Sequence, residues 1–395
     1  MFYQCPKCKN IWQYPIEKCP NCFLGLEKLL TKTAKVIGVS KINIPTLLHP
    51  KVPYFVLVLE DEKGNKWAYK SLKEYKIGEE FIPEVSQNKN AVAVWRIKYD
   101  ILEAIEKVIE LLGGAMRTLS SSSPSPRPPS EGWTRCLKID SQTKILILPT
   151  LVSPKHPYLA INTNPKFLES LINYLLNVGA DKKNIKVAAQ SFDEVPIEAS
   201  AQKSQLLDVC LQNQITPLDL AKGNFVKKTQ DGFTFEISEE VFNSNLIINL
   251  PILKLDLKLG VRGATENILK FLKKESYFSL QYLYSPSKSE GGKEDSSSLT
   301  EEEMMEKLQG VLPNYLTIAD GQTIQKAAGF TAFLGLTLAS LNPLNLDRVF
   351  AEICMVALHQ GSGGGLPEYL KKIKIEDIPI VGRKVEEVQY NLNYV

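Results

Sequence analysis

Two short apolar stretches, KILIL at residues 144–148 and IKVAA at 185–189, flank the longer stretch NPKFLESLINYLLN at 164–177. Unbroken apolar runs of this length are typical of strands buried on both faces of a sheet. The stretch between them has Asn164 as a good N-cap, Pro165 as the first helical residue, a leucine stripe at helical spacing and Gly179 as the stop. This order predicts a right-handed βαβ unit with parallel strands.

The sequence around this unit extends the same pattern. Further strands are expected at 233–237, 245–250 and 315–319, and further helices at 197–211, 264–273 and 346–358. We therefore predict an α/β domain with a mostly parallel sheet over residues 136–395. The polar segment SPSKSEGGKEDSSSLTEEE at 285–303 is expected to be a disordered surface insertion within it.

The N-terminal third has a β-like pattern. Strands are expected at 34–42, 54–59, 66–69 and 91–97, with Gly64 in the hairpin turn between the second and third. Several short strands over about 70 residues favour a small OB-like barrel. An amphipathic helix at 100–112, with Asp100 as N-cap, closes this predicted domain of residues 29–115. The Ser/Pro-rich residues 116–135 are then expected to form a linker.

Four of the seven cysteines lie in two C-x-x-C pairs within YQCPKCKNIWQYPIEKCPNC, residues 3–22. Cys5, Cys8, Cys19 and Cys22 have the spacing of two knuckles that complete a tetrahedral site of four thiolates. Zn²⁺ is the favoured ion, iron is the alternative, and a redox dithiol is less consistent with two pairs side by side. We predict a closed structural zinc ribbon over residues 1–28, because such a small segment cannot build a core of its own.

The bulk properties narrow the class of protein. Formal net charge is +3, from 47 basic and 44 acidic residues, which does not favour a polyanionic partner for the whole chain. The start lacks the order of a signal peptide, and no apolar run approaches the ~20 residues of a membrane span. Paired cysteines together with an odd total favour a reducing compartment. A soluble, cytoplasmic, multidomain protein is the expectation.

Polar residues follow several predicted strands, and ligands of open parallel sheets bind at the carboxyl ends of strands. Asp320, in the sequence ADG, is the sharpest candidate. The unusual loop LPILKLDLKLGVRGATENILK at 250–270 adds basic groups and glycines before a helix, which fits an anion site or equally a solvated basic face. The candidate ligand-binding residues are Lys254, Asp256, Lys258, Arg262, Asn267, Asp320 and Asp347.

Residues 143–382 resemble domain of unknown function family 362. The resemblance rests on ILPTLVSPKHPYLAINTNP, NLPILKLDLKLGVRGATENI, LTIADGQTIQKAAGFTAFLGLTLASLNPLNLDRVFAE and GGGLPEYLKKIKI. The positions that match the family pattern are Lys254, Gly260, Asn267, Asp320, Gly329, Pro343 and Asp347. Some members carry ferredoxin-type clusters, but the single cysteines here do not suffice for one, so no ferredoxin-type iron–sulfur cluster is expected.

Residues 1–98 resemble the rubredoxin-like zinc ribbon plus OB-fold of domain of unknown function family 35. The resemblance rests on CPKC, CPNC, VIGVSKI, VPYFVLVLEDEKGN and KIGEEF. It implies an accessory module that binds a partner protein, such as a thiolase-like acyl-CoA enzyme. Nucleic acid is a second possible partner, through Trp67, Tyr69, Lys70 and Lys73, although aromatic residues in a strand more often pack in the core.

Two functions remain open at this point. The first is an α/β protein that binds an anionic ligand or a metal at the carboxyl ends of its strands, with the ribbon and barrel as an accessory. The alternative is a non-catalytic scaffold or binding protein. Departures from the family pattern at 148–150, 254–256 and 266–267 favour the alternative, and whether the chain is an enzyme is left open.

Overall fold

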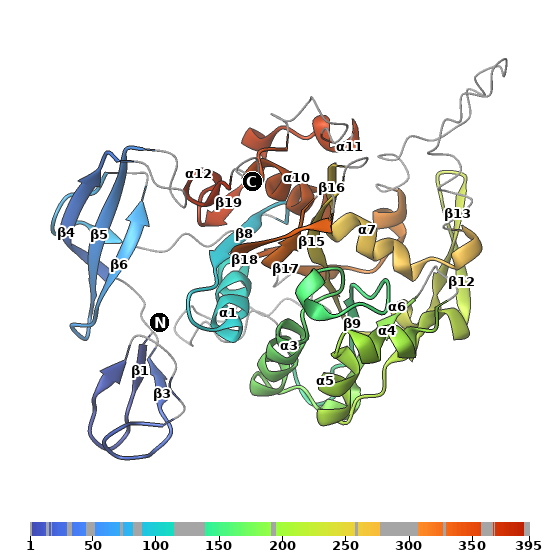
Figure 1. Ribbon diagram of the computed structural model, residues 1–395, viewed down its shortest axis with the longest axis horizontal. Helices are drawn as coiled ribbons and strands as arrows, with labels where there is room; N and C mark the ends of the chain where they lie inside the picture. The colour runs from blue at the N-terminus through green and yellow to red at the C-terminus, as the bar shows by residue number, and fades with distance from the viewer. Residues whose placement is uncertain are drawn as a thin grey trace, which may run out of the picture.

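The fold is taken from a computed structural model. It describes residues 2–12, 16, 18–29, 34–44, 52–71, 74–81, 89–113, 139–190, 195–256, 260–276, 307–326, 329–356, 366 and 368–390. Two predicted segments, the linker at 116–135 and the insertion at 285–303, lie outside these residues. The architecture has a small N-terminal part and a large part with helices around a central sheet (Figure 1).

The large part is built on a ten-stranded mixed sheet. Its strand order is β11-β10-β9-β14-β17-β18-β8-β19, and β15 pairs with β17 and with β16. The strands are β8 (Val92–Arg96), β9 (Ile145–Pro149), β10 (Ile185–Ala189), β11 (Leu218–Asp219), β14 (Leu246–Leu250), β15 (Ile252–Asp256), β16 (Gly260–Arg262), β17 (Tyr315–Gln325), β18 (Thr331–Ser340) and β19 (Ile380–Gly382). The run from β11 to β17 is parallel, and β18 is antiparallel to both of its neighbours.

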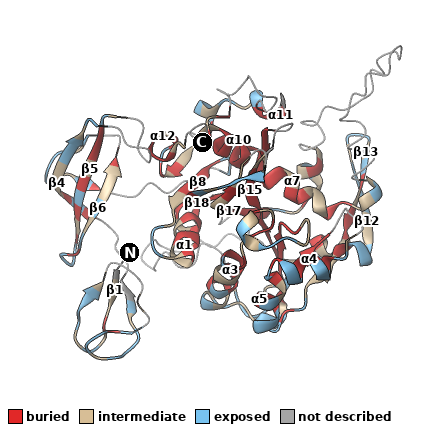
Figure 2. Ribbon diagram, viewed as in Figure 1, coloured by how far each residue is buried: buried red, intermediate tan, exposed pale blue. Residues whose placement is uncertain are grey.

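The predicted βαβ unit is present. Strands β9 and β10 are parallel neighbours, and helix α3 (Pro165–Asn177) connects them. The Asn164 side chain caps this helix by accepting a hydrogen bond from the Lys166 amide at 2.9 Å. All five residues of β9 are buried, as the unbroken apolar run predicts. Figure 2 shows that buried residues are concentrated in the interior of the large part.

Alternation along the central strands divides the core into two layers. Ile145 and Ile147 of β9 pack in a cluster with α3 and with α1 (Ile101–Leu111), whereas Leu146 and Leu148 pack in a second cluster. The second cluster contains residues of α7 (Ala264–Ile268) and α10 (Pro343–Ile353). Helices therefore cover both faces of the sheet. Among the described residues, further α-helices are α4 (Ile197–Lys203), α5 (Leu206–Gln212), α6 (Glu239–Phe242), α11 (Glu368–Lys371) and α12 (Val385–Val388).

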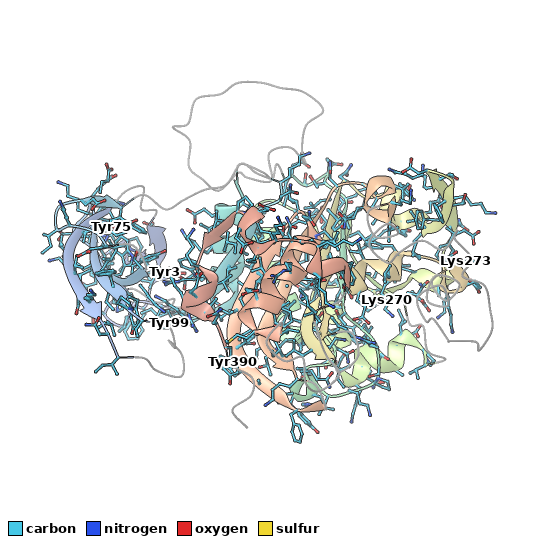
Figure 3. The ribbon with its side chains drawn as sticks, turned by 90° about the horizontal axis from the view of Figure 1, so that it is seen from above. Tyr3, Tyr75, Tyr99, Lys270, Lys273 and Tyr390 are labelled. Atoms are coloured by element: carbon cyan, nitrogen blue, oxygen red, sulfur yellow. The ribbon has the colours of Figure 1, made fainter. Side chains whose placement is uncertain are left out.

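The N-terminal part contains two smaller antiparallel sheets. The first has the order β2-β1-β3, from β1 (Phe2–Gln4), β2 (Ile11–Trp12) and β3 (Glu27–Leu29). The second has the order β6-β5-β4-β7, from β4 (Ala34–Ile42), β5 (Tyr54–Asp61), β6 (Lys66–Ser71) and β7 (Glu80–Phe81). Among the described residues β6 does not pair with β7, so the second sheet is described here as a four-stranded sheet rather than a closed barrel. Tyr3 and Tyr75 lie in this part, at the opposite end of the molecule from Lys270 and Lys273 (Figure 3).

One strand assigned to the barrel belongs instead to the large sheet. Strand β8 pairs with β18 and β19, and Val92, Ala93 and Val94 have no exposed surface. The helix that follows it, α1, packs against α3. The physical reason is burial on both faces, which a strand of a small one-faced sheet does not require. The change from N-terminal to large part therefore falls between β7 and β8, before the Ser/Pro-rich segment.

Other differences concern the extent of elements. The helix expected at 197–211 is divided into α4 and α5 at Gln205, whose φ of 63° is left-handed. Strand β17 continues to Gln325, six residues beyond its predicted end at 319, and α10 starts at Pro343 because Asn342 caps it. The strand expected at 233–237 is β13 (Phe233–Ser238), which forms a separate hairpin with β12 (Phe225–Gln230). Among the described residues, no helix is long and apolar enough to span a membrane.

Candidate functional site

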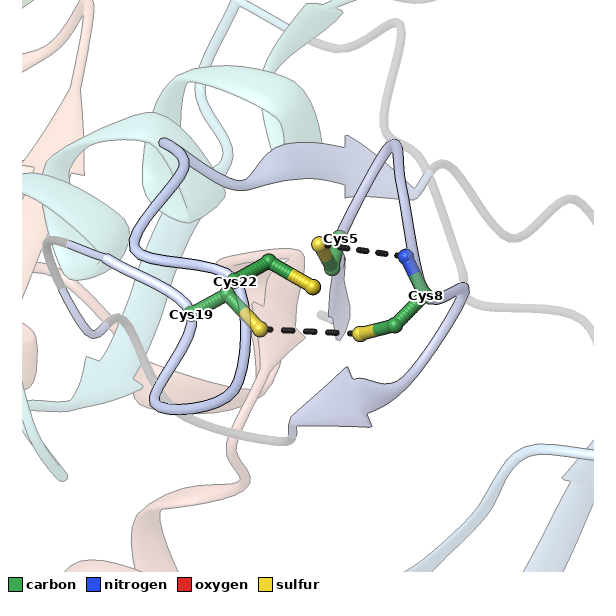
Figure 4. A group of neighbouring side chains, drawn as sticks. All are labelled: Cys5, Cys8, Cys19 and Cys22. Atoms are coloured by element: carbon green, nitrogen blue, oxygen red, sulfur yellow. Dashed lines mark hydrogen bonds between the residues drawn. The ribbon is translucent and has the colours of Figure 1, made fainter.

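The four N-terminal cysteines form one cluster (Figure 4). Their sulfur atoms all lie within 4.8 Å of one another, and Cys5 and Cys19 are fully buried. The sulfurs of Cys8 and Cys19 are 3.6 Å apart. A tetrahedral Zn–S bond of about 2.3 Å requires sulfurs separated by about 3.8 Å. The donor set and its spacing therefore fit a metal ion such as zinc.

The two knuckles have the same backbone pattern. The amide of Lys9 donates to the Cys5 carbonyl at 3.0 Å, and the amide of Phe23 donates to the Cys19 carbonyl at 2.8 Å. Lys9 and Phe23 adopt φ of 60° and 55°, a left-handed conformation that glycine takes most easily. The sequence thus forms both knuckles without glycine at these positions.

Burial raises the pKa of Cys19 and Cys22, whereas the local contacts of the Cys5 thiol favour the thiolate that metal binding requires. Desolvation raises its pKa, but hydrogen bonds from the backbone amides of Cys8 and Lys7 outweigh this and lower it to about 7. The Cys8 amide lies 3.5 Å from the Cys5 sulfur. Hydrogen bonds to the charged form stabilise the thiolate.

Asp320 lies at the carboxyl end of the parallel part of the sheet. Its side chain is 1% exposed, and burial raises its pKa to about 6 although two backbone hydrogen bonds lower it. One carboxyl oxygen accepts from the Asn164 amide at 2.9 Å, and the other accepts from the Gln322 amide at 3.1 Å. Asp320 therefore joins β17 to the start of α3. Asp320 lies inside β17, which continues to Gln325, rather than directly after the strand as the sequence suggested. Buried carboxyl groups with a raised pKa are a recurrent feature of functional sites.

Lys254 lies on β15, the strand beside Asp320. Ile252 of β15 pairs with Asp320, whereas Lys254 pairs with Gln325 of β17 after a shift in register between the two pairs. Lys254 is 7% exposed and pairs with Arg262 of β16. Arg262 forms an ion pair with Glu266 at 3.3 Å. The Asp256 side chain and the whole of Lys258 lie outside the described residues.

Asp347 lies in the other core layer from α3, and its side-chain contacts are structural. Its carboxyl oxygens accept from the amides of Ala264 and Thr265 at 2.7 and 2.8 Å, and also from the Thr265 hydroxyl. It therefore caps α7 from α10, within the core layer opposite to α3. Burial raises its pKa to about 6, against the hydrogen bonds from Thr265 and Ala264. The structure does not bring Asp347 together with Asp320.

Asn267 is part of a buried hydrogen-bond network at the ends of β9 and β14. Its side-chain amide donates to the Leu148 carbonyl at 2.9 Å and to Asn249 Oδ1 at 2.8 Å, and its oxygen accepts from the Thr150 hydroxyl at 3.0 Å. Thr150 in turn accepts from the Ile252 amide at 3.2 Å. Buried polar groups in proteins are generally hydrogen-bonded, and the partners of the Asn267 side chain fix α7 to the sheet.

Three of these contacts were not anticipated from sequence. Asn164 was expected only as a helix cap, whereas its amide also binds Asp320. Asn249 was hidden inside the apolar run NLIINL, and Thr265 was not singled out. Asn164 and Thr265 lie 156 and 82 residues from their partners Asp320 and Asp347, and Asn249 lies 18 residues from Asn267. No local sequence pattern indicates these pairs.

Two solved structures are weakly similar to this chain. One solved structure, "Ltp2-ChsH2(DUF35) aldolase", has 21% identity and a TM-score of 0.18, and the match covers 21% of this chain and 70% of that chain. The lactate racemase apoprotein from Thermoanaerobacterium thermosaccharolyticum has 11% identity and a TM-score of 0.41, over 71% of this chain and 60% of that chain. Both values are too low to carry an argument about function. No curated protein matches the sequence.

The family comparison covers the region built around β9, β14, β17 and β18. It matches residues 145–352 of the 395, from the first residue of β9 almost to the end of α10. This range contains Lys254, Asp320 and Asp347, and it exceeds half of the chain. The protein therefore belongs to the family described as domain of unknown function DUF362.

Proposed function

We propose that the α/β part binds a small anionic ligand at the carboxyl ends of β14, β15 and β17. The observation that carries this proposal is the buried carboxyl of Asp320, which binds the start of α3, together with the buried Lys254 on the adjacent strand β15. Lys254 would supply the positive charge and Asp320 a polar contact with the ligand. Arg262 of β16, which pairs with Lys254, would add a second positive group, and Asp256 and Lys258 stay candidates from the sequence alone.

The raised pKa of Asp320 gives this proposal a pH dependence. An ionised carboxyl beside the ligand repels an anion, whereas a protonated carboxyl donates a hydrogen bond to it. The pKa of Asp320 is about 6. Binding of an anion should therefore tighten as the pH falls through about 6.

Calorimetric titration of the full-length protein with inorganic phosphate and with simple carboxylates tests this site. Lys254→Met should weaken anion binding at least about tenfold, the effect of losing about 1.4 kcal/mol. Asp377→Asn removes an exposed carboxyl elsewhere and serves as the control. Equal affinities for the wild type and Lys254→Met would refute the anion site. Saturable binding of Mg²⁺ or Mn²⁺ that is lost in Asp320→Asn would instead favour a metal site.

For the N-terminal part we propose a Zn²⁺-bound ribbon followed by an OB-fold-like accessory module. The support is the four-cysteine cluster together with the antiparallel order β6-β5-β4-β7. The metal's contribution would be structural, since four thiolates fill a tetrahedral site. A partner protein, for example an acyl-CoA enzyme, is the expected occupant of the module's surface.

A non-catalytic scaffold is the second candidate function. Two candidate ligand residues favour it, because their polar atoms are bound within the protein: Asp347 caps α7, and Asn267 binds β9 and β14. Pull-down from a cell extract and gel-shift assays with the full-length protein test it. Binding of a partner that survives the Lys254→Met substitution would support the scaffold, and absence of both protein and nucleic-acid partners at low salt would count against it.

A further inference from the structure

Arg383 connects the four-stranded sheet with the edge of the large sheet. It directly follows β19, and its amide donates to the Val94 carbonyl of β8 at 2.8 Å. Its guanidinium lies 4.6 Å from the ring centre of Tyr69 in β6 and 5.2 Å from that of Trp95 in β8. One planar cation thus contacts an aromatic ring of each part.

Polar contacts reinforce this stacking. Arg383 Nη1 donates to the Lys70 carbonyl at 3.2 Å and forms an ion pair with Glu387 at 3.4 Å. In return, Lys70 Nζ donates to the Glu387 carbonyl at 3.3 Å, and Arg96 Nη2 donates to the same carbonyl at 3.2 Å. The C-terminal segment therefore exchanges hydrogen bonds with β6 in both directions.

The contact region is buried from water. The side chains of Arg383 and Glu387 are 6% and 4% exposed. Burial lowers the pKa of Lys70 to about 8, and nearby Arg96 and Arg383 add to this while Glu387 opposes it. In such a dry contact, removal of one partner leaves the other charge buried and unpaired, so partial loss is strongly unfavourable.

The segment also covers an edge of a sheet. Among the described strands, β6 pairs with β5 on one side only, and the carbonyl of Lys70 binds Arg383 rather than another strand. Exposed edge strands offer unpaired backbone groups to other chains, and proteins commonly cover them. The covered strand holds Trp67, Tyr69 and Lys70, three of the four sequence-based candidates for a nucleic-acid surface; the fourth, Lys73, lies outside the described residues.

We propose that residues 383–388 act as a strap, with Arg383 as its central group, that holds the four-stranded sheet against the large sheet and covers β6. When the strap is released, the N-terminal part separates from the α/β part and the edge of β6 becomes accessible. Tyr69 and Lys70 are therefore internal contacts of the closed form.

Small-angle X-ray scattering of the full-length protein tests the strap. Arg383→Ala should raise the radius of gyration and broaden the distance distribution, and Arg383→Lys should do so less, because lysine keeps the charge but loses the planar stack. Arg348→Ala is the matched control, since Arg348 forms a similar ion pair with Glu352 at 2.9 Å, four residues on, away from the joint. It should leave the scattering curve unchanged.

A variant on the other side of the joint separates release from misfolding. Tyr69→Ala leaves every residue of the large part in place, and it should give the same expansion with an unchanged circular dichroism spectrum. An unchanged radius of gyration in folded Arg383→Ala or in folded Tyr69→Ala would overturn the proposal. Expansion in Arg348→Ala equal to that in Arg383→Ala would also overturn it.

Discussion

Replacement of Asp320 by asparagine is the sharpest test of the burial of the candidate site. The pKa of this carboxyl is raised by burial from 3.8 to about 6. At 1.36 kcal/mol for each pH unit, the difference corresponds to about 3 kcal/mol. Because the folded state prefers the protonated form, this stabilisation is present below pH 3.8 and is lost as the pH rises to about 6.

The asparagine variant removes this titration but introduces a cost of its own. Asp320 accepts hydrogen bonds from two backbone amides, of Asn164 and Gln322. Asparagine has a single acceptor oxygen, so one of these amides loses its partner at a cost of about 1–3 kcal/mol. We expect the variant to be less stable than the wild type in acid and of similar or greater stability at neutral pH.

Urea denaturation followed by far-UV circular dichroism, repeated between pH 4 and pH 7.5, measures the difference in free energy of unfolding between the wild type and Asp320→Asn. The free energy of unfolding of the wild type relative to the variant should fall by about 2.4 kcal/mol across this range, because the carboxyl of the unfolded chain is already more than half ionised at pH 4. Asp347 titrates equally in both proteins and cancels from the difference. A difference that stays constant within about 0.5 kcal/mol would refute the reasoning, as would the same change in the exposed-site variant Asp377→Asn.

Two further outcomes are expected. Cys5→Ser/Cys8→Ser should lose one equivalent of bound metal and make the N-terminal part sensitive to protease, while the thermal transition of the α/β part stays unchanged; metal content equal to that of the wild type would contradict the cluster geometry. Gly263→Ala should destabilise the α/β part by about 1–3 kcal/mol, because the added Cβ would lie too close to Asp347 Oδ1, and Gly223→Ala, with only an ordinary contact at 3.5 Å, is its control.

The four-cysteine cluster and the candidate ligand site differ in how they arise from the sequence. The cysteines of each knuckle are three residues apart, so their spacing alone indicates that they meet. Asp320 was identified from a local rule, its position after an apolar strand. Its partner Asn164 is 156 residues away, and only the tertiary fold, in which α3 starts beside the middle of β17, brings them together.

Strand β8 illustrates what local pattern leaves undecided. Its apolar run predicts a strand, but a strand carries no mark of the sheet to which it belongs. Pairing with β18, about 240 residues later, is decided by burial of Val92 and Val94 between the helix layers. The same holds for Asp347, whose sequence position suggested a ligand contact and whose tertiary contacts make it the cap of α7.

The sequence by itself determined the elements whose causes are local: the βαβ unit with its Asn164 cap, the strand runs, and the four-cysteine cluster. Hydrophobic periodicity, helix capping and metal-ligand spacing each act over a few residues, so a short stretch of sequence is enough to predict the elements that depend on them. The tertiary structure decided which strands share a sheet, which buried carboxyls meet which amides, and how Arg383 joins two parts of the chain. These depend on contacts between distant residues, which hydrophobic burial selects only when the whole chain is packed.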